Sequence, residues 1–149
     1  IVEYVHARGL VFGLYTCAGT HTCVGGLPGS KDHWAQDAAL FAQWGVDWVK
    51  MDWCNTEGMT PAETYPLMAQ ALNRTGRRIH FNICEWGVDA PWTWAPALSQ
   101  SWRATADHVG TWASTRDIIR SRSAIAPALG GAPFAWNDMD MLQTGNYAQ

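Results

Sequence analysis

Short apolar runs alternate with amphipathic stretches along most of the chain. The apolar runs predict strands over residues 11–15, 48–51, 79–84, 101–103 and 134–136. The amphipathic stretches predict helices over residues 31–44, 60–74, 93–98 and 112–125. Strands that alternate with helices at this interval are typical of βαβ units, so the pattern predicts an α/β fold with a parallel sheet.

Two helix boundaries are marked by particular residues. Thr60 can cap a helix, Pro61 suits the first helical position, and Glu63 would complete a capping box. Gly45 stands where a glycine commonly ends a helix. We therefore expect one helix to end at residue 44 and another to begin at residue 60.

Composition excludes several classes of protein. With 149 residues, 48% hydrophobic and 15% charged, the chain can form one folded domain. Its net charge is −3 without a basic block, so a nucleic-acid partner is not expected. No apolar run approaches the roughly 20 residues of a membrane-spanning helix, so no membrane partner is expected. The absence of CxxC, HExxH and GxGxxG motifs leads us to expect neither a metal nor an organic cofactor.

The chain begins in the middle of a pattern, without an initiator Met, and shows no signal peptide. We therefore expect residues 1–149 to be an excised piece of a longer protein. On its own, such a piece is expected to be poorly stable and inactive, because an incomplete sheet leaves strand edges unpaired.

Polar residues recur at or just after the predicted strands. These residues are Lys50 and Asp52, then Glu85, then Arg103 and Asp107, and finally Asp138 and Asp140. In a (β/α)8 barrel the C-terminal rim of the strands carries the chemistry. With about five strands, the chain is predicted to be a partial (β/α)8 TIM barrel, covering about strands 3 to 7.

Lys50 and Asp52 suggest a specific chemistry. Side chains alternate along a strand with period two, so both project to the same side. A nearby cation favours the ionised form of a carboxylate, as a nucleophile requires, and two carboxylates on opposite sides of a glycosidic bond can hydrolyse it. A simple ion pair at the end of a strand is the alternative explanation for this pair alone.

Four ordered motifs carry a family resemblance. VDWVKMDWC at 46–54, CEWG at 84–87, SWRATAD at 101–107 and WNDMDML at 136–142 resemble glycoside hydrolase family 27, whose best-known members are α-galactosidases (melibiases). GLYTCAGTHTCVGGLPGS at 13–30 is similar to that family's loop after the third barrel strand. The resemblance runs from about Leu10 to Tyr147. It implies a retaining exo-glycosidase that hydrolyses terminal α-galactosyl residues by double displacement, with a galactoside as its small-molecule or oligosaccharide partner.

The same resemblance implies roles for individual residues. Asp52 matches the catalytic nucleophile and Asp107 the general acid/base. The residues that match sugar-contacting positions are Tyr15, Lys50, Glu85 and Arg103.

Further residues lie within or beside the matched motifs. Asp138 and Asp140 match two carboxylates of the family, and our hypothesis is that they orient neighbouring groups or the acid/base. Trp53, Trp86 and Trp136 stand beside the motifs, and at least one of them is expected to line the sugar site.

The four cysteines fall into two classes. Cys23 and Cys54 match a pair that forms a disulfide beside the nucleophile in this family, and such a bond suggests a secreted or extracytoplasmic protein. Two free buried thiols are the alternative for this pair in a reducing cytosol. Cys17 and Cys84 match no partner and are expected to be buried and unpaired.

Some alternatives remain open at the level of sequence. Met139 replaces a proline of the family motif, and the strands that would meet the exocyclic carbon of the sugar are absent. A relative acting on β-L-arabinopyranosides is therefore a second possibility. A relative acting on α-N-acetylgalactosaminides is disfavoured by the bulk of Glu85 and Trp86. A non-catalytic carbohydrate-binding barrel would be expected to lack Asp52 or Asp107, and an aldolase-like barrel would use Lys50 as a Schiff-base amine.

Overall fold

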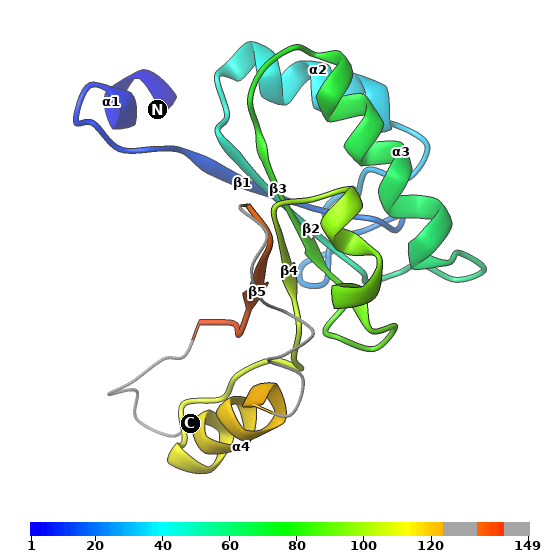
Figure 1. Cartoon of the computed structure of the whole chain (residues 1–149). Coiled ribbons are helices and arrows are strands. Elements are labelled where there is room, and N and C mark those ends of the chain that lie inside the picture. Colours follow the sequence, from blue (N-terminus) through cyan, green and yellow to red (C-terminus); the bar gives the residue numbers. More distant parts are fainter. Residues whose placement is uncertain (124–133, 142–149) are drawn as a thin grey trace. The chain divides into compact units, whose positions relative to one another are not determined.

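The structure, a computed structural model, describes residues 1–123 and 134–141 and divides into two compact units. The first unit is residues 1–84 and the second is residues 85–149. Each unit is described by itself below, with elements labelled as in Figure 1.

The first unit is a parallel three-stranded βαβαβ arrangement preceded by a short helix. Its elements are α1 (Val2–His6), β1 (Gly13–Cys17), α2 (Trp34–Trp44), β2 (Trp48–Asp52), α3 (Pro61–Arg74) and β3 (His80–Cys84). β1 pairs with β2 and β2 with β3, all in parallel, while α2 and α3 pack against each other (Figure 1). The predicted parallel α/β pattern is confirmed for this unit. The five-residue helix α1 was not predicted, because it is too short to show helical periodicity.

The strand register brings the chemically important positions to one edge of the sheet. Cys17 lies opposite Asp52, which in turn lies opposite Cys84. Tyr15 lies opposite Lys50, two residues before the Cys17–Asp52 pair on each strand. The carboxyl ends of all three strands therefore meet at the same edge.

The core of the first unit is formed by alternate residues of the strands and by one face of α3. Val49, Met51, Phe81 and Ile83 are buried on the strands. The buried residues of α3 include Tyr65, Met68, Ala69 and Leu72, which have the spacing of a single helical face. Each large apolar side chain buried in this way contributes about 1.5–3 kcal/mol to stability.

Helix ends follow the sequence signals only in part. Gly45 ends α2 in the left-handed conformation with φ of 79°, as predicted. The predicted capping box at Thr60 is wrong: its hydroxyl donates to Glu63 Oε2 at 2.8 Å, and no side chain caps the backbone. The Thr60 hydroxyl thus donates to a charged acceptor in the first turn of α3.

Asp47 connects the segment before β1 to the rest of the unit. Its carboxylate accepts from Phe12 N at 2.8 Å and from Arg77 Nη2 at 2.6 Å, and it lies 2.6 Å from His6 Nε2. Burial raises the pKa of this carboxyl, but the hydrogen bonds and the His6 charge outweigh burial and lower it. Asp47 thus anchors both α1 and the start of β1.

The second unit contains a parallel strand pair and one longer helix. Its elements are the 3-10 helices η1 (Pro91–Thr93) and η2 (Ala95–Ala97), then β4 (Ser101–Arg103), α4 (Trp112–Ser123) and β5 (Trp136–Asp138). β4 pairs with β5 in parallel, with Arg103 opposite Asp138, and Trp102 Nε1 donates to Asn137 Oδ1 at 2.7 Å. β4 has the predicted bounds, whereas residues 124–125 of the predicted last helix lie outside the described residues.

Two predicted elements of this unit differ in the structure. The helix expected over residues 93–98 is replaced by η1 and η2, because prolines at 91 and 96 cannot donate backbone hydrogen bonds. The last strand begins two residues later than expected, so Asp138 lies within β5 rather than after it.

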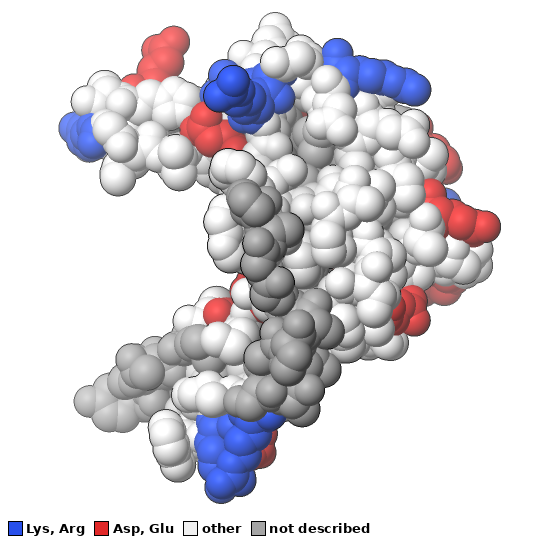
Figure 2. Space-filling view, viewed as in Figure 1, with Lys and Arg blue, Asp and Glu red and all other residues white. Residues whose placement is uncertain are grey.

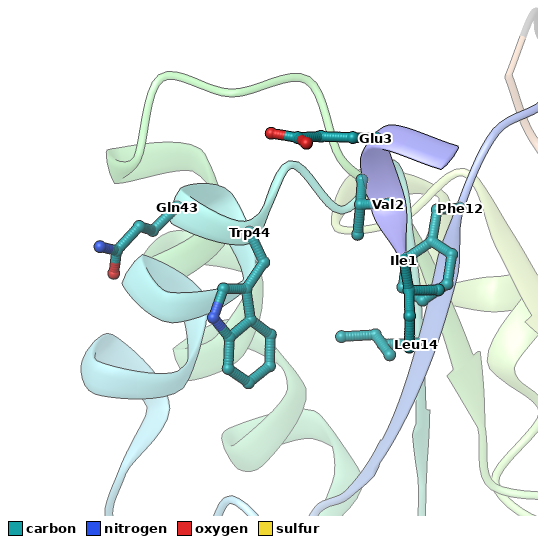
Figure 3. A pocket seen from close by; sticks show the side chains of 7 residues that line it. All are labelled: Ile1, Val2, Glu3, Phe12, Leu14, Gln43 and Trp44. Carbon is teal, nitrogen blue, oxygen red and sulfur yellow. The ribbon is translucent and has the colours of Figure 1, made fainter. Parts of the chain in front are cut away.

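The surface is mostly uncharged on the face drawn in Figure 2, where Lys and Arg stand in small separate groups. An apolar groove of about 480 Å³ lies beside β1, with Ile1, Val2 and Leu14 on one side and Trp44 on the other (Figure 3). An exposed sheet edge and apolar surface of this kind are usually covered in a complete domain. Over residues 1–123 and 134–141, no helix combines the length and the apolar character that crossing a bilayer requires.

Gly19 tests the close packing of the loop after β1. A Cβ at this position would lie 2.0 Å from Asn55 O and 2.2 Å from Cys54 O. Gly19→Ala should lower the free energy of unfolding by about 3 kcal/mol, since backbone must move to make room. Gly25→Ala is the control, because its Cβ would meet nothing within 4 Å and only its φ of 81° opposes the change, at about 1 kcal/mol. Thermal unfolding of the two variants should show the larger decrease in Tm for Gly19→Ala, and equal decreases would contradict this account.

Candidate active site

Asp52 is a buried carboxylate at the end of β2. It is 6% exposed, and two protein groups donate to it: Tyr15 Oη to Oδ2 at 3.1 Å and Trp53 N to Oδ1 at 3.0 Å. Lys50 Nζ lies 3.7 Å from Oδ2. A buried carboxylate is strongly disfavoured unless it is paired and hydrogen-bonded, and both requirements are met here.

Strand geometry explains why these groups meet. Lys50 and Asp52 are two residues apart on β2, so they project to the same side of the sheet. Tyr15 is the register partner of Lys50 on β1, and Lys50 Nζ lies 5.7 Å from the centre of its ring. From that position the phenol reaches along the sheet to the Asp52 carboxylate.

The phenol of Tyr15 is suited to donate rather than to ionise. Burial raises its pKa, and the negative charge of Asp52 raises it further, so that it lies above its ordinary range. Tyr15 therefore keeps its proton at all ordinary pH values. Its O–H remains a hydrogen-bond donor to Asp52.

A disulfide joins the loop after β1 to the end of β2. Cys23 and Cys54 are bonded, with their Cα atoms 5.1 Å apart, as the resemblance implied. Tyr15 Oη lies 3.2 Å from Cys23 Sγ, so the bond borders the Asp52 cluster. Asn55 Nδ2 also donates to His21 O at 3.0 Å, which holds the same loop.

Cys17 has a structural function that the sequence did not reveal. Its thiol donates to Cys54 O at 3.1 Å and accepts from Cys54 N at 3.2 Å. Burial raises its pKa and keeps the thiol protonated. The sulfurs of Cys17, Cys23 and Cys54 lie within 4.8 Å of one another, but two of them are joined, so this trio does not supply three metal ligands. Cys17 and Cys84 are buried and neither forms a disulfide, as expected.

In the second unit, one guanidinium connects two carboxylates. Arg103 is 2% exposed; its Nη2 lies 2.7 Å from Asp107 Oδ1 and its Nη1 lies 3.0 Å from Asp140 Oδ1. The Asp107 side chain is 75% exposed, whereas that of Asp140 is 7% exposed. Arg103 therefore holds an exposed carboxylate from a buried position.

Asp140 organises the backbone around this ion pair. Its Oδ2 accepts from His108 N at 2.6 Å, and its own N–H donates to Asp138 Oδ1 at 2.8 Å. Asp140 has a φ of 64°, in the left-handed region that non-glycine residues seldom adopt. These contacts fix the residue that follows Asp107.

Glu85 is buried and bound to its own loop. It is 1% exposed, and its carboxylate accepts from Gly87 N at 3.0 Å and from Asp89 N at 2.7 Å. Burial raises the pKa of Glu85 to about 7, against the opposing effect of the two backbone donors. Gly87 cannot easily be replaced, because a Cβ there would lie 2.4 Å from Ala104 O and its φ is 79°.

The two units thus bring together most of the predicted site residues in two clusters. The first unit joins Tyr15, Lys50, Asp52, Cys23 and Cys54, and the second joins Arg103, Asp107, Asp138 and Asp140. Trp53 stacks on Tyr65 of α3, with ring centres 5.2 Å apart, so its indole also packs on the helix layer. Trp86 has an unusual positive φ of 61°.

Comparison with known proteins reveals a consistent family. A protein-family model described as "Alpha galactosidase A" (Melibiase_2) matches residues 1–149. Alpha-galactosidase 3 of Arabidopsis thaliana is 47% identical over 98% of this chain, and the chain spans 33% of that relative's length. The crystal structure of alpha-galactosidase I from Mortierella vinacea has a TM-score of 0.88 and 33% identity, over 99% of this chain and 43% of that one.

A β-L-arabinopyranosidase from Geobacillus stearothermophilus shares the fold, with a TM-score of 0.77, but is only 21% identical. The predicted α/β fold class, that of part of a barrel enzyme, is confirmed by these structural matches.

Titration of Glu85 tests its buried environment. The carboxyl should ionise with a pKa of about 7, well above the usual value for glutamate of roughly 4.3. The pKa of Glu85 is higher in the folded state than in the unfolded state, so the protonated carboxyl contributes to the stability of the fold. This contribution is fully present below the unfolded-state pKa and is lost as the pH rises through about 7. Carboxyl 13C NMR of labelled protein, with Glu85→Gln to assign the signal, should show this titration. A Glu85 signal that titrates near pH 4 would contradict the prediction.

Proposed function

Because the chain belongs to the melibiase family described as alpha galactosidase A, we propose that the protein is a retaining exo-glycosidase acting on terminal α-galactosyl residues. The observation that carries this proposal is the buried Asp52 carboxylate, held between the Tyr15 phenol and the Lys50 ammonium. The relatives named alpha-galactosidase are 41%, 45% and 47% identical in three cases, which favours α-galactosides over β-L-arabinopyranosides.

The reaction proceeds by two displacements at the anomeric carbon. In the first, an Asp52 oxygen attacks that carbon while Asp107 gives its proton to the glycosidic oxygen, and the leaving group departs as an alcohol. The product of this step is a galactosyl ester of Asp52. In the second, the Asp107 carboxylate takes a proton from water, whose oxygen displaces Asp52 and restores the original anomeric configuration.

The surroundings of each carboxylate support its role. Asp52 is buried beside the Lys50 ammonium and the Tyr15 phenol, two groups that compensate the charge of a carboxylate nucleophile. Asp107 is exposed and tethered through one oxygen to Arg103, so that water and substrate can reach it. These different environments fit two carboxylates with different tasks.

We also propose the remaining site residues in the roles expected from the sequence. The sugar-contacting residues are Tyr15, Lys50, Trp53, Glu85, Trp86 and Arg103, with Asp138 and Asp140 as orienting residues. The contacts of Asp140 with Arg103 and with the His108 N–H support an orienting role near Asp107.

Two further properties of the whole protein complete the proposal. The matched relatives are about three times as long as this chain, which supports residues 1–149 as part of a larger catalytic barrel. The Cys23–Cys54 disulfide supports a location in an oxidising, extracytoplasmic compartment.

A mechanism-based label tests the nucleophile. The full-length protein should be inactivated by a galactose-configured fluorosugar, and peptide mass spectrometry should place the adduct on Asp52. A glucose-configured probe is the control for sugar configuration, and Asp52→Ala should take up no label. An adduct on another residue, or none on folded full-length protein, would overturn the assignment.

Azide products distinguish the two carboxylates. Asp107→Ala should lower kcat/KM for unactivated α-galactosides by about 10²–10⁴-fold, since proton transfer to the leaving group is lost. With α-galactosyl fluoride, whose leaving group needs no proton, azide should displace the Asp52 ester and yield the α-galactosyl azide. In Asp52→Ala, azide replaces the nucleophile itself, and β-galactosyl azide is expected.

Asp89→Ala is the matched control for these variants, because the exposed Asp89 contributes its backbone N–H to Glu85 and that group is kept. Its activity should stay close to that of the unmodified protein. The same azide anomer from Asp107→Ala and Asp52→Ala would contradict the two roles.

A further inference from the structure

A cleft of about 440 Å³ lies in the second unit, beside Asp107. Its walls come from the segment around Asp107, from Trp86 and Gly87, and from one side of α4. Small-molecule sites in proteins typically measure roughly 300–1,000 Å³, so the cleft has the size of a ligand site.

The side of α4 that lines the cleft is unusually polar. Ser114, Asp117, Ile118 and Ser121 line it, and they are spaced i, i+3, i+4 and i+7, which is a single helical face. A helix face that packs on a core normally carries apolar residues at these positions. Here only Ile118 is apolar and buried, so the face anchors the helix at one point. Asp117 Oδ1 accepts from Arg116 Nε at 2.9 Å and Ser121 Oγ donates to Ile118 O at 2.8 Å, so any further hydrogen bond from a ligand is one that these oxygens accept.

The opposite wall adds complementary groups. Trp86 contributes an indole, whose face suits the apolar side of a sugar ring. Thr105 also lines the cleft; it is 6% exposed, and its Oγ1 has no hydrogen-bond partner among the described residues. Buried hydroxyls without a partner are uncommon, and a bound molecule or water often satisfies them.

We propose that this cleft binds the leaving group of the substrate, a saccharide or other polyol, with Asp117 and Ser121 as hydrogen-bonding residues and Trp86 as a stacking surface. The inference rests on the proposed function, in which Asp107 protonates the glycosidic oxygen. That oxygen belongs to the leaving group, so the leaving group must extend from Asp107. Asp107 lines the cleft, which also offers aromatic, hydroxyl and carboxylate groups suited to a polyol.

The effect of the cleft should depend on the size of the leaving group. Raffinose has a disaccharide leaving group that could fill the cleft, whereas the fluoride of α-galactosyl fluoride is a single atom that cannot reach α4. In the full-length protein, Asp117→Ala with Ser121→Ala should lower kcat/KM for raffinose about tenfold more than for α-galactosyl fluoride. That ratio corresponds to about 1.4 kcal/mol of lost transition-state binding.

Arg120→Ala is the matched control, since Arg120 is an exposed residue of the same helix that does not line the cleft. It should leave both values of kcat/KM close to those of the unmodified protein. Thermal unfolding of the double variant shows whether α4 is still folded, and the fluoride activity provides a second check.

Each remaining outcome counts against the cleft. Equal losses on both substrates would show that Asp117 and Ser121 act only through folding, and no loss on raffinose would remove them from substrate binding. A selective loss on raffinose accompanied by a shifted pH profile of kcat/KM would show that they act through the acid function of Asp107, whereas leaving-group binding predicts an unchanged pH profile. If the unmodified protein hydrolyses neither substrate, the proposed function is rejected, and the leaving-group site is rejected with it. If it hydrolyses both and the selective loss is absent, only the leaving-group site is rejected.

Discussion

The first unit depends on compensating one carboxylate that is almost wholly buried. Asp52 has lost nearly all its water, and the compensation comes from the Tyr15 phenol, the Trp53 backbone N–H and the Lys50 ammonium. These partners come from two neighbouring strands, so the cluster exists only while β1 and β2 keep their register. Removing one partner would leave a buried charge under-compensated, which lowers the free energy of unfolding by about 3–5 kcal/mol.

The loop after β1 maintains that register from outside the sheet. The Cys23–Cys54 bond and the paired hydrogen bonds of Cys17 with Cys54 both tie β1 and its loop to the end of β2. Gly19 allows this close approach, because a Cβ on it would lie 2.0 Å from Asn55 O. Gly29 lets the loop fold back on itself, since a Cβ there would lie 2.1 Å from Gly19 O. The nucleophile candidate therefore lies beside one of the most constrained parts of the unit.

Much of the fold could be read from the sequence because its elements carry strong local signals. The strand at Ser101–Arg103 and the helix at Pro61–Arg74 have the bounds, or nearly the bounds, that hydrophobic pattern and proline position predict. Capping signals were less informative: the Thr60 hydroxyl donates to the Glu63 carboxylate, and no side chain caps the start of α3. A short helix such as α1 has no periodicity to detect, and its position depends on the distant Asp47.

The candidate site was predictable in residue type, but not in the contacts that each residue makes. The period of a strand places Lys50 beside Asp52, but nothing in the sequence shows that both oxygens of Glu85 accept from its own loop or that Trp53 stacks on Tyr65. Such choices are decided by tertiary packing. The structure is therefore most informative about side chains that had several possible contact partners in the sequence.

The ion pairs of Arg103 have a consequence for turnover. The guanidinium binds Asp140 with one nitrogen and Asp107 with another, and only the latter carboxylate is exposed. In the proposed reaction Asp107 alternates between acid and base once per cycle, while the buried pair with Asp140 stays in place. Arg103 thus keeps its position through the cycle, and Asp107 can gain and lose its proton at the surface without a rearrangement of the buried residues.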